Sequence, residues 1–348
     1  MRDCGHYYFS VFLFYCTTKA SNYIRLLNTE KRVYSDEEEI RLDHYLVKQF
    51  SDYSRTQIQK MIKNDHVTVN DCVEKVSYKL QEGDSIHIEF MEFKTGNQNI
   101  IPEPIPLDIL FEDDEILVIN KQAGLVVHPG TGNYTGTLVH GLKYHCTDLS
   151  SVNDASRPGI VHRLDQYTSG VMVVAKTNNA HRKIAAQFQD RLVTKTYLGI
   201  TWGVWKEQKG SINASLKRSR KDPTSFRVDE TGRSAVTDYS VLKEFRYMSV
   251  VEFSPKTGRT HQLRVHAAHM NHSVINDEKY NGGLNRTKGF LPEVQRDIKL
   301  LLNKLGRHAL HAQRLSFTHP QSGEMVNFTV ELPQDMQSLI DYMQAHYG

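Results

Sequence analysis

The stretch that most constrains this chain runs from Gly159 to Gly170 and reads G-I-V-H-R-L-D-Q-Y-T-S-G. Basic, acidic and hydroxyl side chains crowd between the two glycines, and an apolar run at residues 171–174 follows at once. Catalytic groups commonly sit in a polar loop that feeds a β-branched strand, because the strand holds the loop rigidly. Asp165 is then a candidate nucleophile. From the residues alone, the commoner outcome is a structural turn in which Asp165 caps the backbone or pairs with Arg163.

Length and composition indicate a folded protein of two domains. The chain has 348 residues, of which 39% are hydrophobic and 24% charged, and a net charge of +3 permits a polyanionic partner without requiring one. The 4 cysteines are far apart and form no C-x-x-C pair, which argues against a zinc knuckle or a disulfide framework and favours a reducing cytoplasm. These cysteines are Cys4, Cys16, Cys72 and Cys146.

We expect residues 1–38 to be a variable N-terminal extension. The apolar run at residues 7–16 is shorter than the roughly 20 residues that a membrane-spanning helix needs. It also lacks a small-residue cleavage pattern, so a signal peptide is not expected. The sequence therefore predicts no membrane association.

A small domain is predicted at residues 39–91. Apolar residues recur at helical spacing from Leu42 to Phe50, and a second helix follows the candidate N-cap residue Ser54. Alternating patterns at residues 67–69 and 86–90 then indicate strands.

A linker is predicted at residues 92–106, because three of the chain's 10 prolines lie close together there. A larger domain is predicted at residues 107–340. Its strand and helix patterns do not alternate regularly, which favours an α+β fold with a mostly antiparallel mixed sheet over a doubly wound fold. Strands are expected at 116–119, 196–201, 236–242, 248–253, 315–318 and 326–332, and helices at 179–189, 264–270 and 292–306.

The string H-R-L-D-Q-Y-T-S-G at residues 162–170 resembles the signature of the RluA-type pseudouridine synthases. Lys195-Thr196-Tyr197 resembles the K-x-Y motif of that family, and residues 256–266 resemble its G-R-T-H-Q-[IL]-R-x-H segment. The resemblance implies a pseudouridine synthase fold in which Asp165 is catalytic, Tyr197 stacks on the target base, and Arg259 is the counter-ion of Asp165. Residues 39–91 resemble the alpha-L RNA-binding module that precedes this domain in several relatives.

The same resemblance implies contacts with substrate and RNA. Substrate-binding residues are expected at His162, Arg163, Leu164, Thr168 and Leu310. A basic arm and the second helix of the small domain are expected to contact phosphates. The residues concerned are Lys217, Arg218, Arg220 and Lys221 in the arm, beside Phe226, and Arg55, Gln59, Lys60 and Lys63 in the helix.

The function that the resemblance implies is conversion of specific uridines to pseudouridine, most like the D-type branch that acts on large-subunit ribosomal RNA. The alternatives are a synthase that acts on another RNA, such as transfer RNA, and a non-catalytic RNA-binding assembly factor. A hydrolase or phosphotransferase with an Asp nucleophile is disfavoured, because the chain has no D-x-D or P-loop pattern. We expect a cytoplasmic monomer with ribosomal RNA as partner.

No metal and no cofactor are expected. Four histidines lie close together in the sequence, but they lack a carboxylate or cysteine in a recognised ligand spacing. They are His261, His266, His269 and His272.

Overall fold

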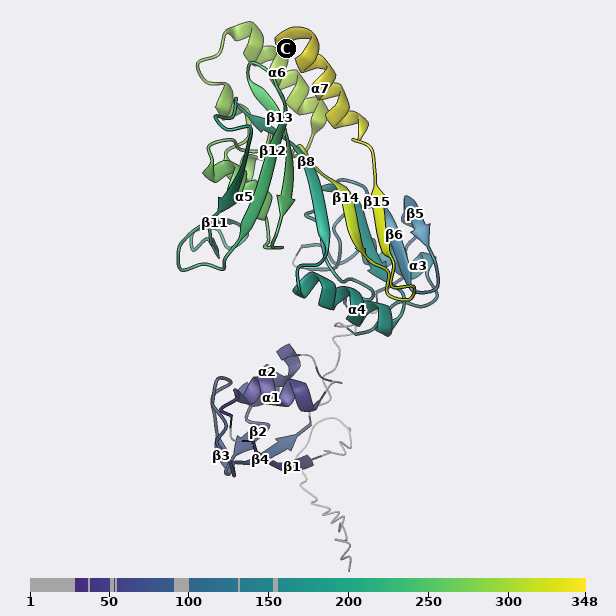
Figure 1. The fold of residues 1–348 in the computed structure, drawn as a ribbon, viewed down its shortest axis with the longest axis vertical. Helices are drawn as coiled ribbons and strands as arrows, with labels where there is room; N and C mark the ends of the chain where they lie inside the picture. Colours follow the sequence, from purple (N-terminus) through teal and green to yellow (C-terminus); the bar gives the residue numbers. More distant parts are fainter. Residues whose placement is uncertain are drawn as a thin grey trace, which may run out of the picture. The chain divides into compact units, whose positions relative to one another are not determined.

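The computed structural model describes residues 29–36, 38–50, 53, 55–90, 100–130, 132–152 and 156–348, with the side chains of residues 55 and 56 left out. The chain divides into two compact units, Met1–Phe93 and Lys94–Gly348 (Figure 1). Most of the expected N-terminal extension, residue 91 of the predicted small domain and residues 92–99 of the expected linker lie outside the described residues.

The first unit is a small sheet with two helices. Helices α1 and α2 bury the apolar residues that predicted them, among them Leu46 and Ile58, against Val67 and Ile86 of the strands. The two helices and the strands predicted between residues 39 and 91 are therefore confirmed. The elements are β1 (Thr29–Val33), α1 (Leu42–Gln49), α2 (Arg55–Lys63), β2 (Val67–Val69), β3 (Cys72–Val73) and β4 (Ser85–Glu89), and the sheet order is β1-β4-β2-β3.

Strand β1 lies within the residues that the sequence assigns to a variable extension. It pairs antiparallel with β4 along its whole length, and Tyr34 behind it is buried in the core of the small unit. The strand reads T-E-K-R-V, so it has little hydrophobic alternation to mark it. Charged residues are usual on an edge strand, because they discourage pairing with other chains.

The second unit is built on a 9-stranded sheet in the order β5-β6-β7-β14-β8-β13-β12-β9, with β15 paired to β14. Among these described strands β7 and β14 pair in parallel and the other neighbours pair antiparallel, so the predicted α+β class with a mostly antiparallel mixed sheet is confirmed. The strands are β5 (Ile109–Glu112), β6 (Ile116–Lys121), β7 (Ser169–Ala175), β8 (Thr194–Trp202), β9 (Lys209–Asn213), β12 (Val236–Glu244), β13 (Met248–Pro255), β14 (Leu310–Thr318) and β15 (Met325–Thr329).

Helices cover this sheet, and a separate hairpin of β10 and β11 extends beside it. Helices α6 and α7 lie side by side and bury Ile298 and Met336 in the largest core (Figure 1). The further elements are α3 (Leu138–His145), α4 (Asn178–Gln189), β10 (Leu216–Arg218), β11 (Phe226–Val228), α5 (Gln262–His269), η1 (Glu278–Tyr280), η2 (Leu284–Thr287), α6 (Pro292–Leu305) and α7 (Gln334–Tyr347).

Several described elements of the larger unit were not predicted from the sequence, namely α3, α7, β5, β9, β10, β11 and the short η1 and η2. The predicted domain ended at residue 340, inside α7. Helix α3 has only 8 residues and carries Gly141, which leaves too little periodicity to detect. The expected linker is also shorter than predicted. Ile100 and Ile105 pack in the core cluster that also contains residues of α3, so this part of the expected linker packs against the larger unit.

The pairing of β7 with β14 places the polar loop of residues 159–170 at the centre of the sheet. Gly170 pairs with Ala312 at a φ of 118°, and a Cβ at this glycine would lie 2.1 Å from the carbonyl oxygen of Ala312. Only glycine allows this backbone contact. The loop that carries Asp165 therefore ends where the two halves of the sheet meet.

Candidate active site

The buried Lys121 side chain holds the loop that contains Asp165 in place. The Lys121 ammonium donates hydrogen bonds to the carbonyl oxygens of Gln122, Leu125 and Gln166 at 2.8, 2.9 and 3.0 Å. Burial lowers the pKa of Lys121 to about 7. The amide of Gly124 also donates to the Gln166 carbonyl, at 2.9 Å. The residue that follows Asp165 is thus fixed by two donors.

The counter-ion of Asp165 is Arg264. Its Nη1 donates to Asp165 Oδ2 at 3.0 Å, while Nε and Nη2 hold both oxygens of Asp277 at 2.6 and 2.8 Å. Asp277 is 2% exposed, and Arg264 is 7% exposed. Two hydrogen bonds to Asp277 fix the plane of the Arg264 guanidinium group. Its remaining N–H groups therefore point towards Asp165 in a defined direction.

The prediction that Arg259 pairs with Asp165 is wrong in its geometry. Arg259 precedes the turn into α5, and its Nε donates to the carbonyl of Ser234 at 3.2 Å. Arg264 lies within the first turn of α5, so its side chain takes the position opposite Asp165. Arg259 still lines the same cavity, where a role in substrate contact stays a prediction.

His261 is the second cationic or dipolar group beside Asp165. Its Nε2 lies 3.9 Å from Asp165 Oδ1, and its Nδ1 lies 2.7 Å from the hydroxyl of Tyr280. His261 has a left-handed backbone (φ 56°) and immediately precedes α5. The sequence indicated this histidine only as a possible metal ligand, and its place beside Asp165 was not expected.

The balance of burial and charge keeps Asp165 ionised. Burial alone would raise the pKa of this carboxyl group, but the nearby His261 and Arg264 lower it below its usual value. The hydrogen bond from Arg264 acts in the same direction. Asp165 is therefore available as an anion in a largely enclosed site.

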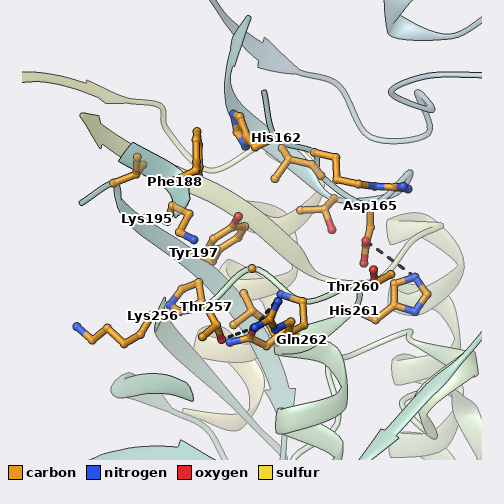
Figure 2. A pocket seen from close by; sticks show the side chains of 18 of the residues that line it. His162, Asp165, Phe188, Lys195, Tyr197, Lys256, Thr257, Thr260, His261 and Gln262 are labelled. Carbon is orange, nitrogen blue, oxygen red and sulfur yellow. Dashed lines mark hydrogen bonds and ion pairs between the residues drawn. The ribbon is translucent and has the colours of Figure 1, made fainter. Parts of the chain in front are cut away.

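The side chain of Asp165 lines a cavity of about 520 Å³. Figure 2 shows Asp165, Tyr197 and His261 directed into this cavity from different segments of the chain. Burial and the charge of Asp165 raise the pKa of the Tyr197 phenol, so it stays protonated. Leu310, 3% exposed, supplies an apolar wall. The volume lies within the range of pockets that enclose a small aromatic ligand.

The remaining predicted substrate contacts line this cavity too. His162 accepts the amide hydrogen of Val173 at 3.0 Å through Nε2, while Leu164 and Thr168 are buried and Arg163 is exposed. The structure thus gives His162 and Thr168 structural bonds and leaves Arg163 accessible to a ligand. Their contact with substrate stays a prediction.

The predicted basic arm is the β10–β11 hairpin. Arg220 and Lys221 lie exposed in its loop, Arg218 lies over the Phe226 ring with 5.1 Å from its guanidinium carbon to the ring centre, and Lys217 donates to Thr231. The hairpin therefore carries four basic residues, one of which lies against an aromatic ring.

In the small unit, Lys60 and Lys63 are exposed in the second half of α2. Gln59 donates to Asp43 at 2.8 Å, so its amide already has a partner. The side chain of Arg55 lies outside the described residues.

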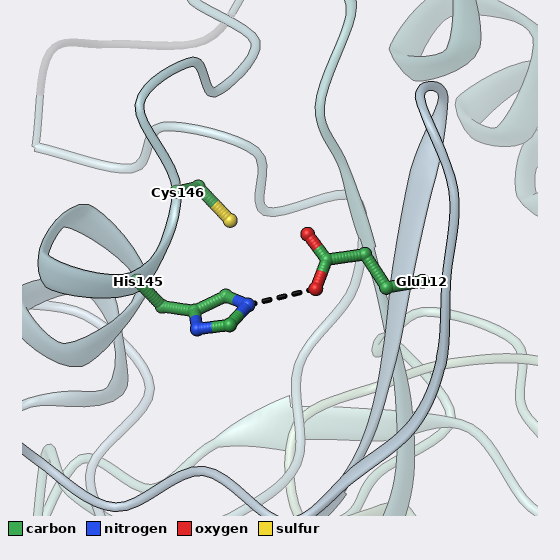
Figure 3. A group of neighbouring side chains, drawn as sticks. All are labelled: Glu112, His145 and Cys146. Carbon is green, nitrogen blue, oxygen red and sulfur yellow. Dashed lines mark hydrogen bonds and ion pairs between the residues drawn. The ribbon is translucent and has the colours of Figure 1, made fainter.

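Among the residues that the structure describes, one set of possible metal ligands comes together, namely Glu112, His145 and Cys146 (Figure 3). Glu112 already binds His145 at 2.7 Å and Lys176 at 2.9 Å, and burial raises the pKa of the Cys146 thiol. A metal would have to compete with a lysine and remove a proton from a buried thiol. We interpret the group as an ion-pair cluster that joins β5 to α3.

The histidines between residues 261 and 272 bond to different partners and do not converge on one metal site. His266 bonds to Thr237 and to the carbonyl of Ala214, and His272 bonds to the carbonyl of Trp202. These contacts give His266 and His272 structural partners. Within the described residues, no helix is long and apolar enough to cross a membrane.

Solved structures share this fold. The human protein called RNA Pseudouridylate Synthase Domain Containing 4 aligns with a TM-score of 0.50 and 27% identity, covering 68% of this chain and 93% of that one. Human RNA Pseudouridylate Synthase Domain Containing 1 aligns with a TM-score of 0.50 and 24% identity, over 70% of this chain and 96% of that one. The larger unit thus has the fold of an RNA pseudouridylate synthase.

Sequence comparisons identify the family. Residues 115–269 match the RNA pseudouridylate synthase family, and residues 40–86 match the S4 domain. An uncharacterised RNA pseudouridine synthase of Bacillus subtilis is 40% identical over 88% of this chain and 95% of its own length. The ribosomal large subunit pseudouridine synthase D of Neisseria meningitidis serogroup A is 40% identical over 88% of this chain and 80% of its length. The chain belongs to the RluA-type RNA pseudouridine synthases.

Proposed function

We propose that this protein converts specific uridines of large-subunit ribosomal RNA to pseudouridine, with Asp165 as the catalytic residue. Relatives that carry the name ribosomal large subunit pseudouridine synthase D, from Neisseria meningitidis and Zymomonas mobilis among others, support the choice of RNA. The observation that carries the assignment of the site is the ionised Asp165, held by Arg264 at the edge of a cavity that also contains Tyr197.

The chemistry suits these residues. Pseudouridine formation breaks the bond between ribose and a uracil nitrogen and rejoins the base through its carbon 5, so no atom is gained or lost. The protein must supply an anionic group, stabilise charge, and retain the detached base. Asp165 is the anion, Arg264 and His261 hold its charge, and Tyr197 offers a ring against which the base stacks. The apolar Leu310 closes the cavity.

The rest of the chain binds the RNA around the target. Removing a uridine from a folded RNA costs a few kcal/mol, which further contacts must offset. The basic residues of the β10–β11 hairpin and the lysines of α2 in the S4 domain are suited to phosphate binding. A tethered module adds affinity even when it binds weakly alone, because linkage raises its effective concentration to about the millimolar range.

A ribosomal RNA substrate requires the enzyme to share a compartment with ribosome assembly, which we propose to be the cytoplasm. We also propose that the protein acts as a monomer.

The substrate can be tested by mapping pseudouridines in cells with and without the gene. We expect the loss of specific pseudouridines from large-subunit ribosomal RNA and their return when the wild-type gene is restored. The matched control is a gene that encodes Asp165→Ala, which should not restore them. Loss of pseudouridines from transfer RNA alone would contradict the choice of substrate, and an unchanged map of both RNAs would contradict the activity.

Neutralising the hairpin should weaken RNA binding and reduce its dependence on salt. Replacing Lys217, Arg218, Arg220 and Lys221 with glutamine removes four charges from one hairpin. The slope of log affinity against log salt should become shallower by about 0.7–0.9 for each phosphate that the protein no longer neutralises. Filter binding of a ribosomal RNA fragment at several salt concentrations measures both quantities.

The control for this experiment removes the same charge elsewhere in the domain. Lys288, Arg296, Lys299 and Lys304 lie in α6 or just before it, away from the hairpin in the sequence. Their replacement with glutamine should leave the salt slope near that of the wild type. Equal slopes for the two quadruple variants would contradict a specific role for the hairpin.

A further inference from the structure

The hydroxyl group of Tyr280 connects the β10–β11 hairpin to the partners of Asp165. It accepts the backbone N–H of Phe226, on β11, at 3.0 Å and lies 2.7 Å from Nδ1 of His261. Tyr280 is 9% exposed and packs in a small apolar cluster with Leu216 and Val265. Because this tyrosine is anchored on both sides, its hydroxyl has a defined position.

The direction of these two hydrogen bonds follows from the chemistry of the groups. An amide N–H can only donate, so the Tyr280 oxygen is the acceptor of the bond from Phe226. A phenol carries a single hydrogen, and among the described residues the structure places one acceptor within reach of it, which is Nδ1 of His261. Tyr280 therefore donates to His261.

This direction determines the tautomer of the histidine. A neutral imidazole carries one proton, so a ring that accepts at Nδ1 has its hydrogen at Nε2. Nε2 is the atom that faces Asp165 Oδ1, at 3.9 Å. Burial lowers the pKa of His261, which agrees with a neutral ring. The other tautomer would direct a lone pair at the carboxylate, which is repulsive.

Tyr280 also contacts the second partner of Asp165. The guanidinium carbon of Arg264 lies 5.0 Å from the centre of the Tyr280 ring, a cation–π arrangement. The rings of Phe226 and Tyr280 both meet the ring of His261 edge to face, with centres 5.8 and 5.6 Å away. One tyrosine thus restrains both groups that hold the carboxylate, and the hairpin restrains the tyrosine.

We propose that Tyr280 is a positioning residue, which fixes His261 with its Nε2–H towards Asp165 and ties that arrangement to the β10–β11 hairpin. The inference rests on the proposed role of Asp165 as the catalytic residue. RNA held by the hairpin then stabilises the arrangement in which Asp165 is ready to react. Tyr280 itself does not touch the base.

The tautomer can be measured directly in the wild-type protein. Histidine labelled with ¹⁵N gives ring nitrogen shifts that distinguish a protonated from an unprotonated nitrogen, and His261 is identified by the signals that vanish in His261→Gln. We expect Nδ1 to be unprotonated and Nε2 protonated at neutral pH. The reverse assignment would overturn the proposal, and this measurement needs neither activity nor a folded Tyr280 variant.

The variant Tyr280→Phe removes the donated hydrogen and keeps the ring. We expect the His261 signals to shift towards a mixture of tautomers, kcat to fall about tenfold, and KM to stay within about twofold. Tyr247→Phe is the matched control, since its ring packs on Phe290, away from the cavity. A Tyr280→Phe variant with wild-type kcat and unchanged His261 signals would overturn the proposal. Full activity of Asp165→Ala would instead disprove the proposed catalytic residue and leave the tautomer result standing.

Discussion

Replacing Asp165 with alanine is expected to lower the rate of pseudouridine formation by about a thousandfold or more, because the cavity then lacks the anion that is directed into it. Binding of the RNA should stay within a few fold of wild type, since the hairpin and the S4 domain are unchanged. Release of tritium from uridine labelled at carbon 5 measures turnover, because the new bond to ribose replaces that hydrogen. Filter binding measures affinity.

Two further variants make the Asp165 result specific. Asp165→Asn keeps the shape of the side chain and removes its charge, and it should be nearly as inactive as Asp165→Ala. Asp341→Ala removes an exposed carboxylate on α7 and should have wild-type turnover. Turnover by Asp165→Ala at the wild-type rate would refute the proposed mechanism.

Replacing Arg264 with methionine should have the second largest effect, and it should act on both activity and stability. The change leaves the buried Asp277 without its partner, which typically costs about 3–5 kcal/mol of unfolding free energy. It also removes the hydrogen bond to Asp165, and we expect turnover to fall by about a hundredfold or more. Denaturant unfolding and tritium release measure the two effects.

A double variant separates stability from activity. In Arg264→Met with Asp277→Asn, the unpaired buried charge is gone, so much of the missing stability should return. Turnover should stay low because Asp165 still lacks its counter-ion. Recovery of turnover together with stability would mean that Arg264 serves the fold alone.

The pH dependence distinguishes Arg264 from Arg259. The pKa of Asp165 lies below its usual value in the wild type, so activity should decline only as pH falls through that lowered pKa. The same shift contributes stability that is present above the unfolded pKa and disappears as pH falls through the folded one. In Arg264→Met burial remains and raises the pKa, so the acid limb of kcat/KM should move to higher pH. Arg259→Met should leave that limb in place, because Arg259 bonds to Ser234 instead.

The sequence was sufficient to locate the candidate reacting group and the wall of its cavity. Asp165 sits in a loop between two glycines, and the structure confirms the strand that follows it. The close backbone contact that requires Gly170 was not predicted. Tyr197 and Leu310 also line the cavity with Asp165, as the family resemblance implies. These residues could be predicted because each belongs to a short sequence motif that the chain shares with its family.

The sequence did not identify which arginine meets Asp165. Arg259 and Arg264 lie in one motif, and their spacing does not show where α5 begins or how the chain turns into it. The turn depends on a left-handed backbone at His261, which is uncommon outside glycine. The buried carboxylate of Asp277 pairs with Arg264 and could have indicated that this arginine points inward. Asp277, however, lies in another segment of the sequence. Side-chain direction after such a turn is a property of tertiary structure.

The position of β14 between β7 and β8 has a consequence for how the enzyme is made. Ser169 pairs with His311, so the centre of the sheet joins residues that are far apart in the chain. A nascent chain that has not yet produced β14 presents two unjoined sheet halves, with the edges of β7 and β8 open to pairing with other chains. Long-range pairing of this kind is slow to form. The cavity beside Asp165 can therefore close only after synthesis has passed Leu310, and until β14 is in place the two open edges favour aggregation.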